Sequence, residues 1–128
     1  MPTLPVTRDN FDSTLQRGLV LLDFWAGWCG PCRAFAPIFE AASDRHPDVV
    51  FGKVDTEDQP ELAAAFDVQG IPTLAVIRDG VLLMAQAGML PAAALDEVVA
   101  KAKALDMDEV RRAIAAGERA DGRPEGQA

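Results

Sequence analysis

The chain has 128 residues, with 12 Lys and Arg against 20 Asp and Glu, so its formal net charge is −8 at pH 7. This length suits one domain with a hydrophobic core and a short appendage. The acidic balance argues against binding to nucleic acid or to an anionic membrane surface, since both require a basic surface. No apolar run approaches the roughly 20 residues that span a bilayer. No secretory signal is visible at the N-terminus, so we expect a cytoplasmic protein.

Its few cysteine and histidine residues limit the chemistry that the chain can carry. Cys29 and Cys32 are the only cysteines, and His46 is the only histidine. They cannot supply the four ligands of a structural zinc site, so we expect no metal site and no bound cofactor. One Cys-x-x-Cys pair in a chain that looks cytosolic indicates a redox function rather than a structural disulfide. His46 itself is predicted to be a solvated loop residue.

The first half of the chain predicts alternating strands and helices. The expected elements are a strand near Val6, a helix over residues 9–17, a central strand over 19–24, a helix over 31–44 and a strand over 49–55. The central strand is apolar at consecutive positions, which is typical of a strand covered on both faces. Asp58 and Glu61 resemble a capping box that would open a further helix. This order implies a right-handed parallel crossover.

The second half predicts an antiparallel pair of strands. Asp79-Gly80 lies between two apolar runs, residues 74–77 and 81–86, and this dipeptide favours a two-residue hairpin turn with positive φ. A helix opened by Pro91 follows. We therefore expect an α/β fold with a mixed sheet of four or five strands and helices on both faces.

Residues 1–104 account for this domain, and an extra helix is predicted over residues 105–118. Asp106 and Glu109 form a second capping-box pattern at its start. We expect the extra helix to pack against its own domain and the chain to be a monomer. Residues 119–128 are rich in Gly, Pro, Glu and Gln, so they are predicted to be a disordered tail.

The two cysteines lie where the central strand gives way to a helix that begins at Pro31. Unpaired backbone N–H groups and the positive end of the helix dipole favour an anion at this position. Since the thiolate is the nucleophile, a cysteine held there is activated near neutral pH. We expect Cys29 to be the exposed attacking thiol, and Cys32, one turn later, to be the more buried resolving thiol.

Four separated motifs resemble the thioredoxin family. They are Asp23-Phe24-Trp25-Ala26, Trp28-Cys29-Gly30-Pro31-Cys32, Lys53-Val54-Asp55, and Gly70-Ile71-Pro72-Thr73 with Gly88 after the hairpin. The resemblance covers roughly residues 6–102. It implies a thioredoxin-like fold and a protein-disulfide reductase that acts in cell redox homeostasis. Its partners would be disulfide-containing protein substrates and a thioredoxin reductase that recharges the Cys29–Cys32 disulfide with electrons from NADPH.

The resemblance also implies a role for each residue of the dithiol site. Cys29 would attack the substrate disulfide, Cys32 would resolve the mixed disulfide, and Asp23 would help to deprotonate Cys32. Lys53 would pair with Asp23, and Pro72 would be cis and face the dithiol. If Asp23 faces the core, desolvation should raise its pKa while Lys53 opposes that shift. The alternative is that Asp23 ends its strand in water and that Lys53 points outward.

A small uncharged docking surface for the substrate is expected around the cysteines. Its expected members are Trp28, Gly30, Pro31, Ile71, Pro72, Gly88 and Met89. A cis Pro72 would leave the Ile71 backbone free to pair with an extended substrate. Met89 stands where the family commonly has a smaller residue, a difference that bears on substrate choice.

Other side chains near the motifs have simpler interpretations. Trp25 is expected to pack in the interior. The nearby carboxylates are expected to form a solvated face rather than a metal site; they are Asp55, Glu57, Asp58 and Glu61.

Two other functions are compatible with the same residues. The protein could be a binding subunit or chaperone whose apolar patch docks a partner, with the extra helix contributing. It could also be an oxidase or isomerase of an oxidising compartment, which the lack of a visible export signal argues against.

Overall fold

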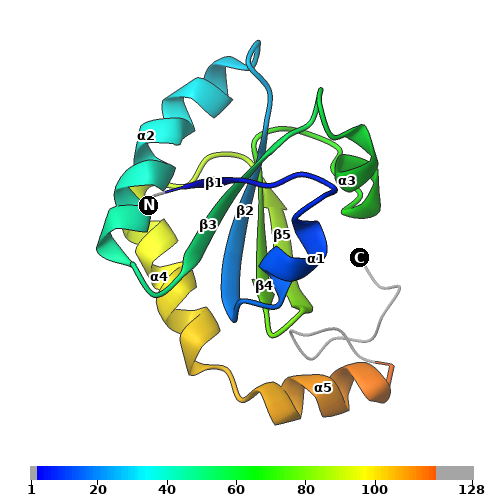
Figure 1. Ribbon diagram of the computed structural model, residues 1–128. Helices are drawn as coiled ribbons and strands as arrows, with labels where there is room; N and C mark the ends of the chain where they lie inside the picture. Colours follow the sequence, from blue (N-terminus) through cyan, green and yellow to red (C-terminus); the bar gives the residue numbers. More distant parts are fainter. Residues whose placement is uncertain (1–2, 118–128) are drawn as a thin grey trace.

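Five strands form one mixed sheet with helices on both faces (Figure 1). The structure is a computed structural model that describes residues 3–117. Its elements are β1 (Leu4–Pro5), α1 (Phe11–Leu15), β2 (Leu19–Trp25), α2 (Gly30–Arg45), β3 (Val50–Asp55), α3 (Pro60–Ala65), β4 (Thr73–Arg78), β5 (Val81–Ala87), α4 (Ala92–Ala104) and α5 (Met107–Ala115). The strand order is β1-β3-β2-β4-β5, with β3 parallel to β1 and β2, and β4 antiparallel to β2 and β5. The predicted mixed sheet is confirmed, with five strands rather than four.

β2 lies at the centre of the sheet, and its successive side chains point alternately into two separate hydrophobic cores. Leu21 points toward α2 and α4, where Phe35 and Phe39 belong to the same buried cluster. Leu22 points to the opposite face, into a cluster that includes Leu62 of α3. Because successive strand residues face opposite sides, a strand buried on both faces must be apolar throughout. Asp23 is the one charged residue of this strand, and it is fully buried.

The hairpin between β4 and β5 has the turn that the sequence predicted. Asp79 and Gly80 have φ values of 54° and 80°, the left-handed conformation that a two-residue turn of this kind requires. The register of the pair shifts once, between Val76 and Ile77.

The predicted capping box at Asp58 and Glu61 is wrong. α3 begins at Pro60, its N-cap is Gln59, and no side chain caps it. Asp58 instead accepts a hydrogen bond from the side chain of Gln59 at 2.8 Å. Proline lacks an N–H and has a fixed φ, so it fits the first helical position and sets the start of the helix without a cap.

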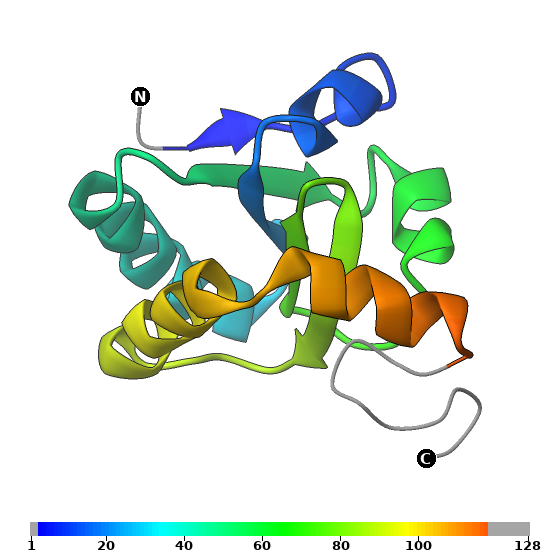
Figure 2. The ribbon, with the colours of Figure 1, turned by 90° about the horizontal axis from the view of Figure 1, so that it is seen from below.

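α5 runs beneath the end of the sheet where the β4–β5 hairpin turns (Figure 2). Asp106 caps it by accepting hydrogen bonds from the Asp108 and Glu109 N–H groups at 3.0 and 3.3 Å. Met107 and Val110 are buried. The predicted tail, residues 119–128, lies outside the described part of the chain.

Arg78 at the end of β4 joins the sheet to this helical extension. Its Nη1 donates to the carbonyl oxygens of Ala102, Lys103 and Leu105 at 2.9, 3.1 and 2.7 Å. Carbonyl groups at a helix C-terminus lack partners within the helix, and a cation there is favourable. Arg78 therefore holds the end of α4 and the link to α5 against the sheet.

His46 is not the solvated loop residue that the sequence indicated. Its Nε2 lies 2.8 Å from Asp96 Oδ1 of α4, and its ring stacks on Phe51. Asp96 also accepts from Arg45 at 2.9 Å. The hydrogen bonds from His46 and Arg45 lower the pKa of the Asp96 carboxyl. This cluster connects the end of α2 to α4, a pairing of distant residues that local sequence patterns do not reveal.

Candidate functional site

The two cysteines form a disulfide at the N-terminus of α2, directly after the central strand. Cys29 is the N-cap of the helix, and its Sγ accepts a hydrogen bond from the Cys32 N–H at 3.2 Å. Pro31 occupies the first helical turn, where its missing N–H leaves no partner unsatisfied. A backbone donor of the first turn is thus directed at the Cys29 sulfur, and the helix dipole adds positive potential there. This arrangement favours a thiolate at Cys29.

The expected contrast in exposure between the cysteines does not hold in the disulfide form. Cys29 is 4% exposed and Cys32 is 3% exposed. The Cys29 sulfur lies 3.7 Å from the Ile71 carbonyl oxygen. The two cysteines differ instead in what they face. Cys29 lines a surface groove, and Cys32 is not among the residues that line it.

The peptide bond between Ile71 and Pro72 is cis, as the resemblance implied. The Ile71 carbonyl oxygen lies beside the Cys29 sulfur, and Pro72 is buried. Gly88 lies beside this loop, since its N–H donates to the Pro72 carbonyl at 2.8 Å. Gly88 has a φ of 102°, which favours glycine at this position.

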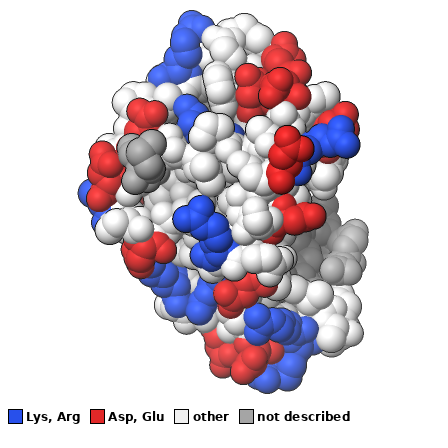
Figure 3. All heavy atoms as spheres, viewed as in Figure 1, with Lys and Arg blue, Asp and Glu red and all other residues white. Residues whose placement is uncertain are grey.

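A groove of about 460 Å³ opens beside Cys29. Trp28 forms part of its rim, with 68% of its surface exposed, and its indole Nε1 donates to Glu57 Oε1 at 3.3 Å. The remaining lining residues are Gly30, Pro31, Thr56, Ala63, Val68, Gln69, Gly70 and Ile71. The lining carries no charged side chain, and Figure 3 shows uncharged atoms at the top of the view, between basic side chains on one side and acidic ones on the other.

Four of the seven expected docking residues line this groove, and the other three, Pro72, Gly88 and Met89, do not. Trp28, Gly30, Pro31 and Ile71 meet around Cys29, whereas Gly88 and Met89 are exposed but do not line it. Sequence patterns missed the side of the groove formed by the residues that follow α3, because small and polar loop residues there carry no periodic signal.

Asp23 is buried on the face of the sheet that α2 covers. It is 0% exposed, and neither carboxylate oxygen has a hydrogen-bond partner among residues 3–117. Burial raises its pKa from the ordinary value of 3.8 to about 6, and the positive charge of Lys53 partly opposes that rise. Charging a carboxylate away from water is unfavourable, so Asp23 can take up and release a proton near neutral pH.

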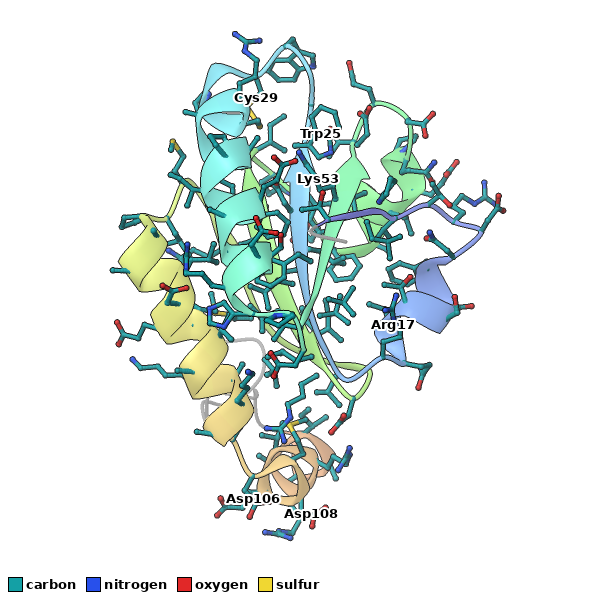
Figure 4. All side chains as sticks on the ribbon, turned by 60° about the vertical axis from the view of Figure 1, so that its left-hand side comes forward. Arg17, Trp25, Cys29, Lys53, Asp106 and Asp108 are labelled. Carbon is teal, nitrogen blue, oxygen red and sulfur yellow. A yellow bond between two sulfur atoms is a disulfide. The ribbon has the colours of Figure 1, made fainter. Side chains whose placement is uncertain are left out.

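Lys53 is half-buried beside Asp23, with which it is in register on the neighbouring strand. Its Nζ lies 4.9 Å from the centre of the Trp25 ring (Figure 4). The alternative of a solvated Asp23 with an outward Lys53 is therefore excluded.

Neither a metal cluster nor a membrane-spanning helix is found in the part of the chain that the structure describes. Residues 3–117 contain no group of three or more His, Cys, Asp or Glu side chains that could hold a metal ion. Their helices are too short or too polar to cross a bilayer. Asp55 and Glu57 instead take part in local hydrogen bonds, the former accepting from the Glu57 N–H at 3.0 Å.

Comparisons with known proteins all indicate the same family. Residues 2–101 match the family described as Thioredoxin. A Streptomyces coelicolor protein that carries the name thioredoxin 2 is 55% identical over 114 residues, covering 88% of this chain and 85% of that protein. The thioredoxin of Staphylococcus saprophyticus is 42% identical over 102 residues, 79% of this chain and 98% of its own length.

A solved structure supports the same family. A mutant thioredoxin from Halobacterium salinarum superposes with a TM-score of 0.76 at 30% identity, covering 81% of this chain and 93% of that one. With a redox-active cysteine pair at the start of α2 and a buried acid on the same face of the sheet, the chain belongs to the thioredoxin family of thiol-disulfide oxidoreductases.

Proposed function

We propose that the protein reduces disulfides of other proteins, with Cys29 as the attacking group and Cys32 as the resolving group. The observation that carries this proposal is the Cys32 N–H directed at Cys29 Sγ, at a helix N-terminus that borders the groove. Reduction of the Cys29–Cys32 disulfide would leave this donor facing the sulfur, where it stabilises a thiolate.

The reaction then has two exchange steps. The Cys29 thiolate attacks one sulfur of the substrate disulfide, which forms a mixed disulfide and releases the first substrate thiolate. Cys32 next loses its proton and attacks Cys29 Sγ. This step forms the Cys29–Cys32 disulfide and releases the second substrate thiolate. The substrate gains two electrons, and the protein is oxidised.

Asp23 would accept the proton that Cys32 loses in the second step. Support comes from its burial on the α2 side of β2 and from its pKa of about 6, which suits proton transfer near neutral pH. Lys53 would limit how far burial raises that pKa.

Substrate would lie extended across the groove and along the cis-proline loop. Trp28, Gly30 and Pro31 offer an uncharged wall on one side. The Ile71 backbone, next to the Cys29 sulfur, would pair with the substrate main chain as an added strand. Pro72 fixes that backbone, and Gly88 and Met89 would contact the substrate beyond the groove.

Members of the family act with a thioredoxin reductase and with disulfide substrates. For this chain, a reductase that supplies NADPH-derived electrons would return the Cys29–Cys32 disulfide to the dithiol. We also infer a monomer, and a cytoplasmic location in keeping with the bacterial relatives. A coupled assay that follows NADPH consumption in the presence of a thioredoxin reductase tests the recharging step.

Reduction of insulin disulfides separates the roles of the two cysteines. Cys29→Ser should abolish turnover because the attacking sulfur is lost. Cys32→Ser should accumulate covalent mixed disulfides, visible on non-reducing gels, because the resolving step is lost. Turnover like that of the parent in Cys29→Ser would overturn the assignment.

A further inference from the structure

Lys53 contacts the Trp25 ring rather than Asp23. β3 places Lys53 directly opposite Asp23 in the parallel register. Its Nζ nevertheless lies 4.9 Å from the Trp25 ring centre, and both Asp23 oxygens are without a hydrogen-bond partner among the described residues. The ammonium group is therefore held close to the buried acid but out of contact with it.

The strand geometry explains how Trp25 reaches Lys53. Trp25 follows Asp23 by two positions on β2, so both side chains lie on the same face of the sheet. In parallel pairing, Lys53 lies on that face as well. An ammonium group over an indole face is attracted by the negative potential of the ring, and more strongly where it is desolvated.

Trp25 has no other polar interaction that fixes its ring. Its Nε1 is buried and has no hydrogen-bond partner among residues 3–117. The contact with Lys53 is thus the specific polar contact of this side chain in the described structure. Figure 4 shows Trp25 and Lys53 together beneath Cys29, close to the start of α2.

We propose that Trp25 is a positioning residue, which anchors the Lys53 ammonium group near Asp23 and thereby sets the proton affinity of that acid. Without the aromatic face, the half-buried Lys53 side chain turns toward water and its charge acts less on Asp23. This inference rests on the proposed function, in which Asp23 accepts the Cys32 proton.

Few other charged or titratable groups face Asp23. Lys53 approaches from β3, and Asp55 lies further along the same face of that strand, opposite Trp25. From β4 the register neighbour is the uncharged Leu74. The charged residues of α2 are exposed, namely Arg33, Glu40, Asp44 and Arg45, and the two cysteines at its start do not titrate in the disulfide form. In the oxidised protein, Lys53 and Asp55 are therefore the charged groups that lie on the Asp23 face of the neighbouring strand.

The test measures the Asp23 pKa by carbon NMR of the carboxyl group in the oxidised protein. Trp25→Leu should raise that pKa, and Trp25→Phe, which keeps an aromatic face, should raise it less. Lys53→Met should raise it most, by about one unit. In the Lys53→Met background, Trp25→Leu should cause no further rise.

Two outcomes would overturn the proposal. One is a shift from Trp25→Leu that is the same with and without Lys53, which would mean that the ring acts on Asp23 independently of Lys53. The other is an unchanged or lowered Asp23 pKa in Trp25→Leu itself. If these variants do not fold, the unmodified protein gives an independent answer, since the ring current should move the Lys53 side-chain methylene protons upfield. Ordinary lysine shifts would contradict the contact.

The pH profile of the second exchange step separates this proposal from the proposed function. If Asp23 accepts the Cys32 proton, the midpoint of that profile should move with the Asp23 pKa across the Trp25 variants. A pKa that moves while the profile stays fixed would refute the role of Asp23 but keep the positioning by Trp25. A pKa that does not respond would refute the positioning alone.

Discussion

At the scale of single residues, Asp23 couples the stability of the fold to pH. Burial raises its pKa from 3.8 to about 6, so the folded protein binds a proton more tightly than the unfolded chain does. The free energy of unfolding must therefore fall as the pH rises through the interval between these two values and stay lower above it. A shift of this size corresponds to a penalty of about 3 kcal/mol at neutral pH.

We expect Asp23→Asn to be more stable than the parent above about pH 6, and to lose this advantage below about pH 4. Urea unfolding of the oxidised protein at a series of pH values measures the difference. Asp12→Asn, at an exposed carboxylate of α1, is the matched control. If the free energies of unfolding of the parent and of Asp23→Asn change in parallel with pH, burial does not raise the pKa of Asp23.

The residues of the dithiol could be identified from the sequence because their chemistry is local. Cys29, Cys32 and the strand that carries Asp23 lie within one short stretch, and a charged residue inside an apolar run is conspicuous. The contact of Lys53 with Trp25 and that of Trp28 with Glu57 could not be predicted. Each depends on how a long side chain turns once two distant segments are adjacent.

At the scale of elements, the close approach of three strands depends on Gly52. A Cβ atom at this position would lie 2.6 Å from Val6 Cγ2 and 2.9 Å from Leu22 Cδ2. Both neighbours are fully or almost fully buried, so neither can move aside without disturbing the core. β3 lies between β1 and β2, and a larger residue there forces them apart.

We therefore expect Gly52→Ala to lower the free energy of unfolding by about 1–3 kcal/mol. Chemical denaturation provides the measurement, and Gly27→Ala, where an added Cβ meets no atom within 4 Å, is the matched control. Equal stability of the Gly52→Ala protein and the parent would contradict the close packing of these strands.

The helices and strands themselves were largely predictable, and their ends less so. Apolar runs and the Asp79-Gly80 turn marked β2, β4 and β5 because those signals are local. The start of α3 was missed because Pro60 outweighed the capping pattern at Asp58. The strand predicted near Val6 spans Leu4–Pro5, and the Val6 N–H that follows it also donates to the Lys53 carbonyl oxygen of β3 at 2.8 Å.

At the scale of the whole molecule, α5 packs against its own chain. Met107 and Val110 are 7% and 5% exposed, and Arg111 pairs with Asp79 of the hairpin turn at 3.6 Å. The match to the Streptomyces coelicolor protein covers 88% of the chain and so extends past Ala104, into this segment. Intramolecular packing was expected from the narrow apolar face of the helix, although the sequence did not reveal which part of the sheet it covers.

Met107→Ala should lower the free energy of unfolding by about 2 kcal/mol, because it removes buried apolar surface and leaves a cavity. Ile114→Ala on the same helix should have a much smaller effect, since Ile114 is 38% exposed. Thermal unfolding of both variants makes the comparison. Equal, small effects of the two substitutions would place the function of α5 in binding a partner rather than in stabilising the domain.

In the proposed mechanism, the fold as a whole lowers the pKa of one thiol, that of Cys29. β2 delivers Cys29 to the N-terminus of α2, the helix aims the Cys32 N–H at it, and the cis-proline loop closes over it. In the proposed mechanism, the second exchange step also relies on Asp23, whereas the first depends only on the ionisation of Cys29.

The most direct test is the pKa of the Cys29 thiol in the reduced Cys32→Ser protein, followed by the ultraviolet absorbance of the thiolate as a function of pH. We expect a Cys29 pKa clearly below the value of about 8.5 for an ordinary cysteine. A value at or above 8.5 would mean that the helix N-terminus does not activate this sulfur, and the proposed mechanism would then be wrong.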